Sequence, residues 1–569
     1  MYIIALATDY DGTLAEDGAV DAATIQALHR FRDSGRRLIL VTGRELPDLK
    51  RVFDRLDLFD RVVAENGALL YAPATEEERP VAPAPPPQFV EKLRRKGVEQ
   101  ISVGRSIVAT WEPHQTTVLD TIREMGLELE IIFNKGAVMV LPSGVNKASG
   151  LTAALEELEL SPLNVAGVGD AENDHALLRF CGFGAAVANA LPALKQGADL
   201  VLTGARGAGV VELITTICDD ETAIPLNDRH RIPIGENDDG PIALYPNDVL
   251  LIAGSSGIGK STLAIALTER MSERQAQFCI FDPEGDYEGL EGTVTLGDGK
   301  TPPTKEQVLQ LLSDPSRSVV VNTLAFELQE RPGFFATLMP DIAALRARTG
   351  RPHYLIIDEA HHLMPSGRDS ASLALSDDVS GTIMITVHPD SLSPAALKTV
   401  TKVVALGPSA ADVIRTVCAI VGETPHDISA APKDDNVLLW DRRAKASGKL
   451  IQVAKPRQSH KRHTRKYAEG HLDEEQSFYF RGPNREMKLR AHNLMMFLQI
   501  AEGIDDGTWQ HHLRAHDYSK WFKGHIGDPA LAEETAAVEQ KDSLSASESR
   551  RLIFEAVRRR YTAPASEKD

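Results

Sequence analysis

Two acidic residues near the start of the sequence have the spacing of a phosphoryl-transfer pair. Asp9 and Asp11 flank Tyr10 directly after the apolar run IIALAT. On an extended loop, side chains two residues apart can point to the same side. One carboxylate can then act as a nucleophile while the other donates and accepts a proton. Such a pair on its own is common in surface turns, so its meaning depends on companion residues.

Three further segments supply companions. Thr42 in VTGR offers a hydroxyl group and a backbone N–H to a phosphate, and Lys147 offers a positive charge at a predicted helix start. Mg²⁺ prefers oxygen ligands, so a third segment, GVGDAENDHALL, can complete a Mg²⁺ site with Asp9. Its ligand candidates are Asp170, Asn173 and Asp174. Helix and turn capping could explain any one of these acids, but it explains the whole ordered set poorly.

Residues 3 to about 215 resemble the haloacid dehalogenase (HAD) phosphatases, in particular the Cof-type branch with an α/β cap. The segments ENGA (Glu65–Ala68) and AVANALPALKQGADLVL add to this resemblance. It implies a phosphoric monoester hydrolase that acts on a small phosphorylated metabolite, either a sugar phosphate or a phosphoglycolate-like ester. The cap looks short, as in the phosphoglycolate and sucrose-phosphate branches.

The same resemblance implies a role for each residue. Asp9 attacks the phosphorus atom, Asp11 protonates the leaving oxygen, and Thr42 and Lys147 hold the phosphoryl oxygens. The implied Mg²⁺ ligands are Asp9, the backbone carbonyl of Asp11 and Asp170, with Asn173 and Asp174 in support.

A second constellation predicts an ATP site. The segment GSSGIGKS (Gly254–Ser261) lies between the apolar run VLLIA and a helix-period segment, which is the strand–loop–helix context of a Walker A motif. Glycines let backbone N–H groups surround the phosphates at a helix N-terminus. The predicted ATP-binding residues are Gly254, Gly257, Gly259, Lys260, Ser261 and Thr262, with Ser261 also a Mg²⁺ ligand. After the run YLII, Asp358 fits the Walker B ligand of Mg²⁺, and Glu359 fits the base that orients water.

Residues 232 to about 425 resemble the HerA–FtsK class of motor ATPases through FDPEGDY, IIDEAHHLMP and ITVHPDSL. This resemblance implies a ring of copies with an arginine finger, for which Arg346, Arg348 and Arg351 are equal candidates. Thr386 and His388 are candidate sensors of the γ-phosphate. The N-terminal barrel of the DNA translocases is replaced by the phosphatase segment, which argues against DNA pumping.

The elements that must position these residues belong to three regions. In residues 1–220 and 221–455, short apolar runs alternate with helix-period segments, which predicts α/β domains with parallel sheets and sites at the carboxyl ends of the strands. The segment PVAPAPPPQ (Pro80–Gln88) suggests the entry to an inserted cap at about 85–144. Residues 456–569 begin with a basic stretch and continue as a helical module. We interpret the basic stretch as a solvated linker, and an arm that binds nucleic acid is the less favoured alternative. In the helical module, His511, His512 and His516 lack the spacing of a metal site, and a stripe of Leu494, Phe497, Leu498 and Ile500 predicts a helix core.

Composition limits the function further. The 569 residues carry 62 basic and 81 acidic side chains, a formal net charge of −19, so binding to nucleic acid through overall charge is not favoured. No apolar run reaches the ~20 residues that span a bilayer, and the first residues do not read as a signal peptide. Four scattered cysteines suggest neither a disulfide framework nor a zinc site, and we expect a cytoplasmic protein. Two alternatives stay open: a ring-forming motor or defence-type ATPase with an accessory HAD unit, and a phosphatase that ATP binding regulates.

Overall fold

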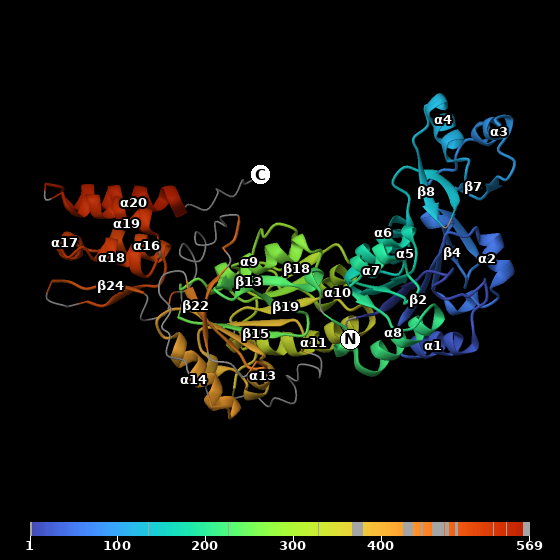
Figure 1. Cartoon of the computed structure of the whole chain (residues 1–569). Coiled ribbons are helices and arrows are strands. Elements are labelled where there is room, and N and C mark those ends of the chain that lie inside the picture. The colour runs from blue at the N-terminus through green and yellow to red at the C-terminus, as the bar shows by residue number, and fades with distance from the viewer. Residues whose placement is uncertain are drawn as a thin grey trace.

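The fold is that of a computed structural model. It describes residues 3–134, 136–225, 227–255, 257–327, 329–366, 379–424, 436–444, 448–453, 455–457, 472, 477–483, 487–526, 528–541 and 543–561. Three parts follow one another along the chain, and the cap projects from the first of them (Figure 1). No helix among the described residues is long and apolar enough to span a bilayer.

The first part contains an eight-stranded sheet in the order β12-β11-β10-β1-β2-β3-β4-β5. Pairing is parallel from β12 to β3 and antiparallel at β4 and β5. The strands are β1 (Ala5–Thr8), β2 (Arg37–Val41), β3 (Arg61–Ala64), β4 (Leu69–Ala72), β5 (Glu77–Pro80), β10 (Val165–Gly169), β11 (Phe183–Ala186) and β12 (Leu200–Val201). The helices are α1 (Ala22–Asp33), α2 (Leu46–Val52), α5 (Lys147–Glu157), α6 (His175–Phe180), α7 (Pro192–Gly197) and α8 (Gly207–Asp220). Every residue of β1 and β10 is buried, as expected for central strands of a parallel sheet.

The cap is inserted between β5 and α5. It is an antiparallel sheet in the order β6 (Ser102–Val103), β7 (Val108–Trp111), β9 (Ala137–Pro142) and β8 (Leu129–Asn134), with helices α3 (Pro87–Arg95) and α4 (Gln115–Met125). Its own apolar core includes Phe89, Leu93, Val118 and Val140. The proline-rich segment therefore leads from the edge strand β5 into the cap.

The second part contains an eleven-stranded mixed sheet in the order β14-β13-β23-β22-β21-β15-β20-β19-β16-β18-β17. Its strands are β13 (Ile232–Asn237), β14 (Gly240–Leu244), β15 (Val249–Ala253), β16 (Phe278–Asp282), β17 (Thr293–Leu296), β18 (Ser318–Asn322), β19 (Tyr354–Ile357), β20 (Thr382–Thr386), β21 (Lys402–Ala405), β22 (Asn436–Asp441) and β23 (Lys449–Val453). Its helices are α9 (Lys260–Glu273), α10 (Lys305–Ser313), α11 (Arg331–Thr349), α12 (Ala360–Leu363), α13 (Pro394–Thr399) and α14 (Ala410–Val421). The predicted α/β class is confirmed for both large parts.

The third part is helical after a short hairpin, as predicted. The hairpin is β24 (Phe478–Phe480) and β25 (Leu489–Ala491), followed by α16 (Leu494–Gly503), α17 (Asp506–Arg514), α18 (Asp517–Gly524), α19 (Pro529–Glu539) and α20 (Ala546–Tyr561). Leu494, Phe497 and Leu498 are buried in an aromatic-rich core, against which Ile500 packs partly buried. His512 accepts from the Arg481 N–H at 2.9 Å and pairs with Asp517, which is a structural role. The predicted basic linker falls largely outside the described residues, since 458–466 are not described.

A buried polar contact joins the first two parts. Asn164, directly before β10, lies 2.9 Å from His353, directly before β19. Arg351 is completely buried, and it donates to the carbonyl oxygen of Glu159 at 2.6 Å as well as to Gln277 at 3.0 Å. The strands that lead to the two predicted sites are therefore linked at their amino ends.

Candidate phosphatase and nucleotide sites

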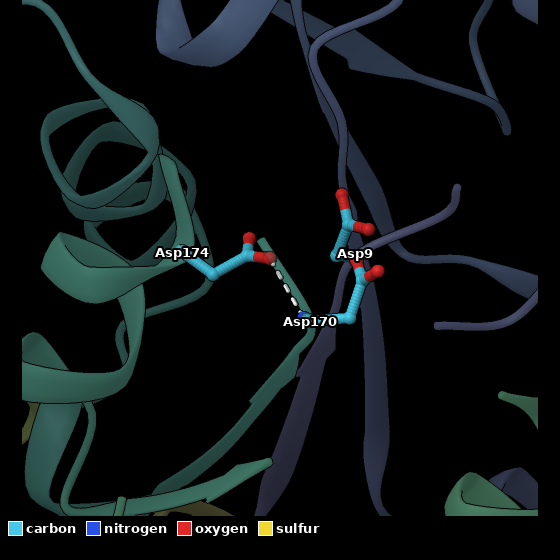
Figure 2. Close-up of side chains that lie close together, drawn as sticks. All are labelled: Asp9, Asp170 and Asp174. Atoms are coloured by element: carbon cyan, nitrogen blue, oxygen red, sulfur yellow. Dashed lines mark hydrogen bonds between the residues drawn. The ribbon is translucent and has the colours of Figure 1, made fainter. Parts of the chain in front are cut away.

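Parallel pairing of β1 with β10 brings two acids to one point. Thr8 lies opposite Val168, and the Asp9 N–H donates to the Val168 carbonyl at 3.0 Å, so Asp9 and Asp170 leave the sheet side by side. Asp174 folds back from the next turn and accepts from the backbone N–H groups of Asp170 and Ala171, both at 2.9 Å. Asp9, Asp170 and Asp174 each offer an oxygen within 4.8 Å of the others (Figure 2).

Lys147 completes this cluster. It begins α5, whose start is fixed by Asn146 accepting from two backbone N–H groups of the first turn. Its ammonium donates to Asp9 at 2.5 Å and to Asp174 at 2.6 Å, with all three side chains almost fully buried. Lys147 therefore contacts Asp9 and Asp174, two predicted site residues from distant segments of the chain.

The electrostatics of the cluster favour a bound cation. Burial raises the pKa of Asp9 to about 7, with Asp174 and Asp170 adding to the effect and Lys147 opposing it. Burial by itself lowers the pKa of Lys147. The neighbouring Asp174 and Asp9 carboxylates raise it by more than this, so the net pKa of Lys147 lies above its usual range. Three buried carboxylates against one ammonium leave excess negative charge, and all the donors are oxygens. The site therefore fits Mg²⁺ in both charge and ligand type.

Thr42 and Asp11 lie at the same edge of the sheet. Thr42 directly follows β2 and is buried, and its N–H donates to the Val63 carbonyl at 2.8 Å. Both carboxylate oxygens of Asp11 accept from Arg44, from Nε and Nη2 at 2.7 Å each. Arg44 belongs to the quoted VTGR segment, but sequence reasoning assigned it no role.

A cavity of about 790 Å³ lies between the sheet edge and the cap. Its floor includes Asp9, Asp11, Arg44, Asp48 and Asn173, and its roof includes Gln100, Ser102, Thr110, Trp111 and Met139. The cap is held on the core by Glu65, which accepts from the backbone N–H groups of Arg105, Ser106 and Ile107 at 2.8, 2.8 and 3.2 Å. A small phosphate ester fits this cavity, which has both polar and apolar lining residues.

The Glu65–Gly67 turn also positions site residues. Asn66, with a φ of 55°, accepts from the Asn173 amide at 2.9 Å. At Gly67, with a φ of +107°, an added Cβ would lie 1.9 Å from the carbonyl oxygen of Asn146, the residue before Lys147. The ENGA segment supported the family resemblance, but its direct contact with the site was not predicted.

The nucleotide residues cluster at the carboxyl ends of three neighbouring strands. β20 lies between β15, which leads to Gly254, and β19, which leads to Asp358. Lys260 begins α9 and donates to the Ser255 carbonyl at 3.0 Å, as expected of a loop that curls back on itself. Gly259 has a φ of +105° and Gly257 one of +77°, conformations that other residues rarely adopt. Ser261 and Thr262 follow in the first turn of α9.

The Walker B end carries its two acids in different surroundings. The Asp358 side chain is buried. The next residue, Glu359, has a backbone φ of 40°, and its carboxylate lies 3.5 Å from the His361 ring. Thr386, one of the two predicted sensor candidates, lies 3.1 Å from the same His361 ring. The other candidate, His388, has its ring 5.6 Å from that of His361, so both lie beside the Walker B acids.

Sequence reasoning missed one acid here. Asp282 ends β16, next to the strand of Asp358, and accepts from the N–H groups of Asp286 at 3.0 Å and Tyr287 at 2.9 Å. Burial raises its pKa to about 7, although the Tyr287 hydrogen bond opposes this. Its position in FDPEGDY, at the end of an apolar run, was the available signal.

The three arginine-finger candidates differ in burial and in hydrogen-bond partners. Arg351 is buried at the contact between the two α/β parts, so it cannot reach a neighbouring copy. Arg346 donates to the carbonyl oxygens of Ser380 and His353 within its own chain. Of the three, Arg348 alone is exposed.

Two parts of the chain match known protein families. Residues 6–108 and 125–214 match the model of the haloacid dehalogenase-like hydrolases. A phosphoglycolate phosphatase 2 of Saccharolobus solfataricus is 31% identical over 227 residues, which cover 38% of this chain and 92% of that protein. A phosphoglycolate phosphatase of Methanothermobacter thermautotrophicus is 29% identical over 219 residues, covering 37% of this chain and 96% of that protein.

The chain belongs to the haloacid dehalogenase-like hydrolases. Residues 232–495 match the model of the central domain of the helicase HerA. The hydrolase domain is therefore fused to a HerA-like domain, as the sequence predicts.

Proposed function

We propose that the hydrolase domain is a Mg²⁺-dependent phosphatase of small phosphomonoesters that works through an aspartyl phosphate on Asp9. The observation that carries this proposal is the convergence of Asp9, Lys147, Asp170 and Asp174 below the cavity between core and cap. The similarity to phosphoglycolate phosphatases favours a phosphoglycolate-like ester over a sugar phosphate.

Each side chain has one task in this reaction. Asp9 attacks the phosphorus atom, the bond to the leaving oxygen breaks, and Asp11 gives that oxygen its proton. Water then attacks the acyl phosphate, Asp11 takes a proton from it, and inorganic phosphate leaves. Lys147 and Thr42 hold the phosphoryl oxygens. Asp9, Asp170 and the Asp11 carbonyl would hold the proposed Mg²⁺, whose charge would offset the repulsion between carboxylate and phosphate.

We further propose that the HerA-like domain binds and hydrolyses ATP. Gly254, Gly257, Gly259, Lys260, Ser261 and Thr262 would bind the phosphates, Asp358 and Ser261 the Mg²⁺, and Glu359 the attacking water. The contiguous arrangement of the Walker A loop and the Walker B acids around β20 supports this.

A pair of substitutions tests both proposals in one protein. Asp9→Asn should abolish phosphatase turnover and leave ATP hydrolysis intact, whereas Lys260→Ala should do the opposite. Release of inorganic phosphate from 2-phosphoglycolate and from ATP, each with Mg²⁺, measures the two activities. Full phosphatase turnover by Asp9→Asn would refute the assigned nucleophile.

A second candidate function is ATP-gated phosphatase activity. The contact of Asn164 with His353 favours it, because these residues precede the strands that lead to Asp170 and Asp358. ATP should then change the phosphatase kcat/KM about 5- to 150-fold, the range of ordinary coupling energies. Asn164→Ala should weaken the effect and Lys260→Ala should remove it. Identical phosphatase rates with and without ATP would exclude gating.

The ring-forming motor with an accessory hydrolase unit remains the other alternative. It rests on the match to the HerA central domain, whereas the phosphatase proposal rests on an assembled set of reacting side chains. ATP hydrolysis stimulated by DNA, together with a hexamer in solution, would favour the motor. Nucleic acid is not the favoured partner, given the net charge of −19.

A further inference from the structure

The cavity of the hydrolase domain is strongly acidic, with one exception. Four carboxylates line it, those of Asp9, Asp11, Glu45 and Asp48. Of the described residues that line this cavity, Arg44 is the only one with a cationic side chain. Arg44 is therefore the residue in this lining that can attract a substrate whose leaving group carries a negative charge.

Arg44 binds Asp11, which protonates the leaving group in the proposed reaction. Its Nε and Nη2 atoms bind the two carboxylate oxygens of Asp11 at 2.7 Å each, and its Nη1 binds Asp48 at 2.5 Å. Both partners of the Arg44–Asp11 pair stay partly accessible, with 25% and 39% of their side chains exposed. The guanidinium can thus exchange one carboxylate for another without opening the core.

We propose that Arg44 recognises a carboxylate on the leaving group and in doing so releases Asp11 for proton transfer. This inference rests on the proposed function. In 2-phosphoglycolate the carboxylate is separated from the ester oxygen by a single carbon. An ester oxygen within reach of Asp11 therefore places that carboxylate beside the residue that Asp11 contacts, which is Arg44.

The exchange links recognition to chemistry. Arg44 exchanges the Asp11 carboxylate for that of the substrate, which is again a bidentate partner, so its hydrogen bonds are replaced and not lost. Asp11 carries no proton while both of its oxygens accept from Arg44, and it takes one up from water once Arg44 releases it. Asp11 then gives this proton to the ester oxygen as the Asp9–phosphorus bond forms and the phosphorus–oxygen bond breaks, which yields the hydroxy acid and the acyl phosphate. An ester with a neutral leaving group cannot take the place of Asp11 on Arg44. The proposal therefore predicts a phosphatase of carboxylate-bearing esters and assigns Arg44 as the residue that sets this specificity.

The test compares two esters on the full chain with Mg²⁺. 2-Phosphoglycolate and 2-hydroxyethyl phosphate have the same number of carbon atoms and differ in a carboxylate against a neutral hydroxyl. The unmodified protein should prefer the carboxylate about 10- to 100-fold in kcat/KM, the range expected for a charge-assisted bidentate contact. In Arg44→Met this preference should fall to about one, as expected when the selective contact is lost. Arg44→Lys, a conservative change with a single point charge, should retain part of it.

A matched control is available on the same carboxylate network. Arg51 also pairs with Asp48 but does not line the cavity, so Arg51→Met should keep the preference of the unmodified protein. A preference that survives in both Arg44 variants, or its absence from the unmodified protein, would overturn the inference while leaving the phosphatase proposal standing. If neither ester shows turnover that depends on Asp9, the proposed function and this inference both fail.

Discussion

Replacing Lys147 by methionine should destabilise the hydrolase domain and make it dependent on a divalent cation. The ammonium bridges Asp9 and Asp174 at 2.5 and 2.6 Å, and the three side chains are 1%, 6% and 0% exposed. Removing one partner of a buried ion pair costs about 3–5 kcal/mol, because the remaining charge stays buried without compensation. Methionine keeps the apolar stem of the side chain, so the loss reports the charge and not a cavity.

The size of this loss should depend on pH and on Mg²⁺. The pKa of Asp9 is already about 7 with Lys147 in place, so in the variant Asp9 takes up a proton more readily, and the loss is larger at pH 8 than at pH 6. A divalent cation replaces the missing positive charge, so Mg²⁺ should stabilise the variant more than the unmodified protein. At a concentration of 100 times Kd, binding alone contributes about 2.7 kcal/mol.

Hydrogen exchange read by mass spectrometry on peptides from β1 and β10 assigns this change to the hydrolase domain. Lys96→Met is the matched control, since Lys96 also pairs with an acid, Glu124 at 2.7 Å, but on the surface. It should leave the exchange of these peptides unchanged. An opening free energy for metal-free Lys147→Met within about 0.5 kcal/mol of the unmodified protein would refute the electrostatic reasoning.

Two further predictions concern the domain contact and the Glu65–Gly67 turn. Burial, with Arg351 nearby, lowers the pKa of His353 from 6.5 to about 3, so below pH 6.5 the unfolded chain binds a proton that the folded chain does not. Stability should therefore fall by up to about 1.4 kcal/mol per pH unit between pH 6.5 and 3, and acid denaturation of His353→Gln should show a shallower slope. Gly67→Ala should destabilise the hydrolase domain by on the order of 3 kcal/mol and reduce phosphatase activity, because its Cβ would meet the Asn146 backbone at 1.9 Å. Thermal unfolding and the phosphate-release assay measure this second change.

Each of these two predictions has a control substitution in the same chain. His525 is exposed, so His525→Gln should keep the full acid slope, and an unchanged slope in His353→Gln would contradict the linkage. Gly97 also has a positive φ, of +85°, but an added Cβ there meets nothing within 4 Å. Gly97→Ala should therefore cost only backbone strain, and an equal loss in both glycine variants would refute the steric argument.

Much of the fold and of the site could be predicted because it depends on local pattern. Buried strands read as apolar runs, and each run ends in the polar loop that carries a site residue, as at Asp9, Asp170 and Asp358. The Walker A loop is likewise a local signal, since its glycines and lysine are contiguous. The α/β class and the fusion of two families followed from these segments.

Contacts between distant segments could not be read in the same way. No spacing rule indicates that Lys147 bridges Asp9 and Asp174, that Arg44 holds Asp11, or that Arg351 is buried at a domain contact. An arginine in a polar segment has the same appearance whether it is a finger, an ion-pair partner or a buried strut.

The amino-acid sequence alone thus determined which segments become strands, which loops follow them and which reacting groups those loops carry. These features depend on side-chain periodicity and on short motifs. Only the tertiary structure decided how the groups are paired, how far they are buried and which arginine faces the cavity. Strand order and domain packing set those properties, and they bring together residues more than a hundred positions apart, such as Asp9 and Lys147.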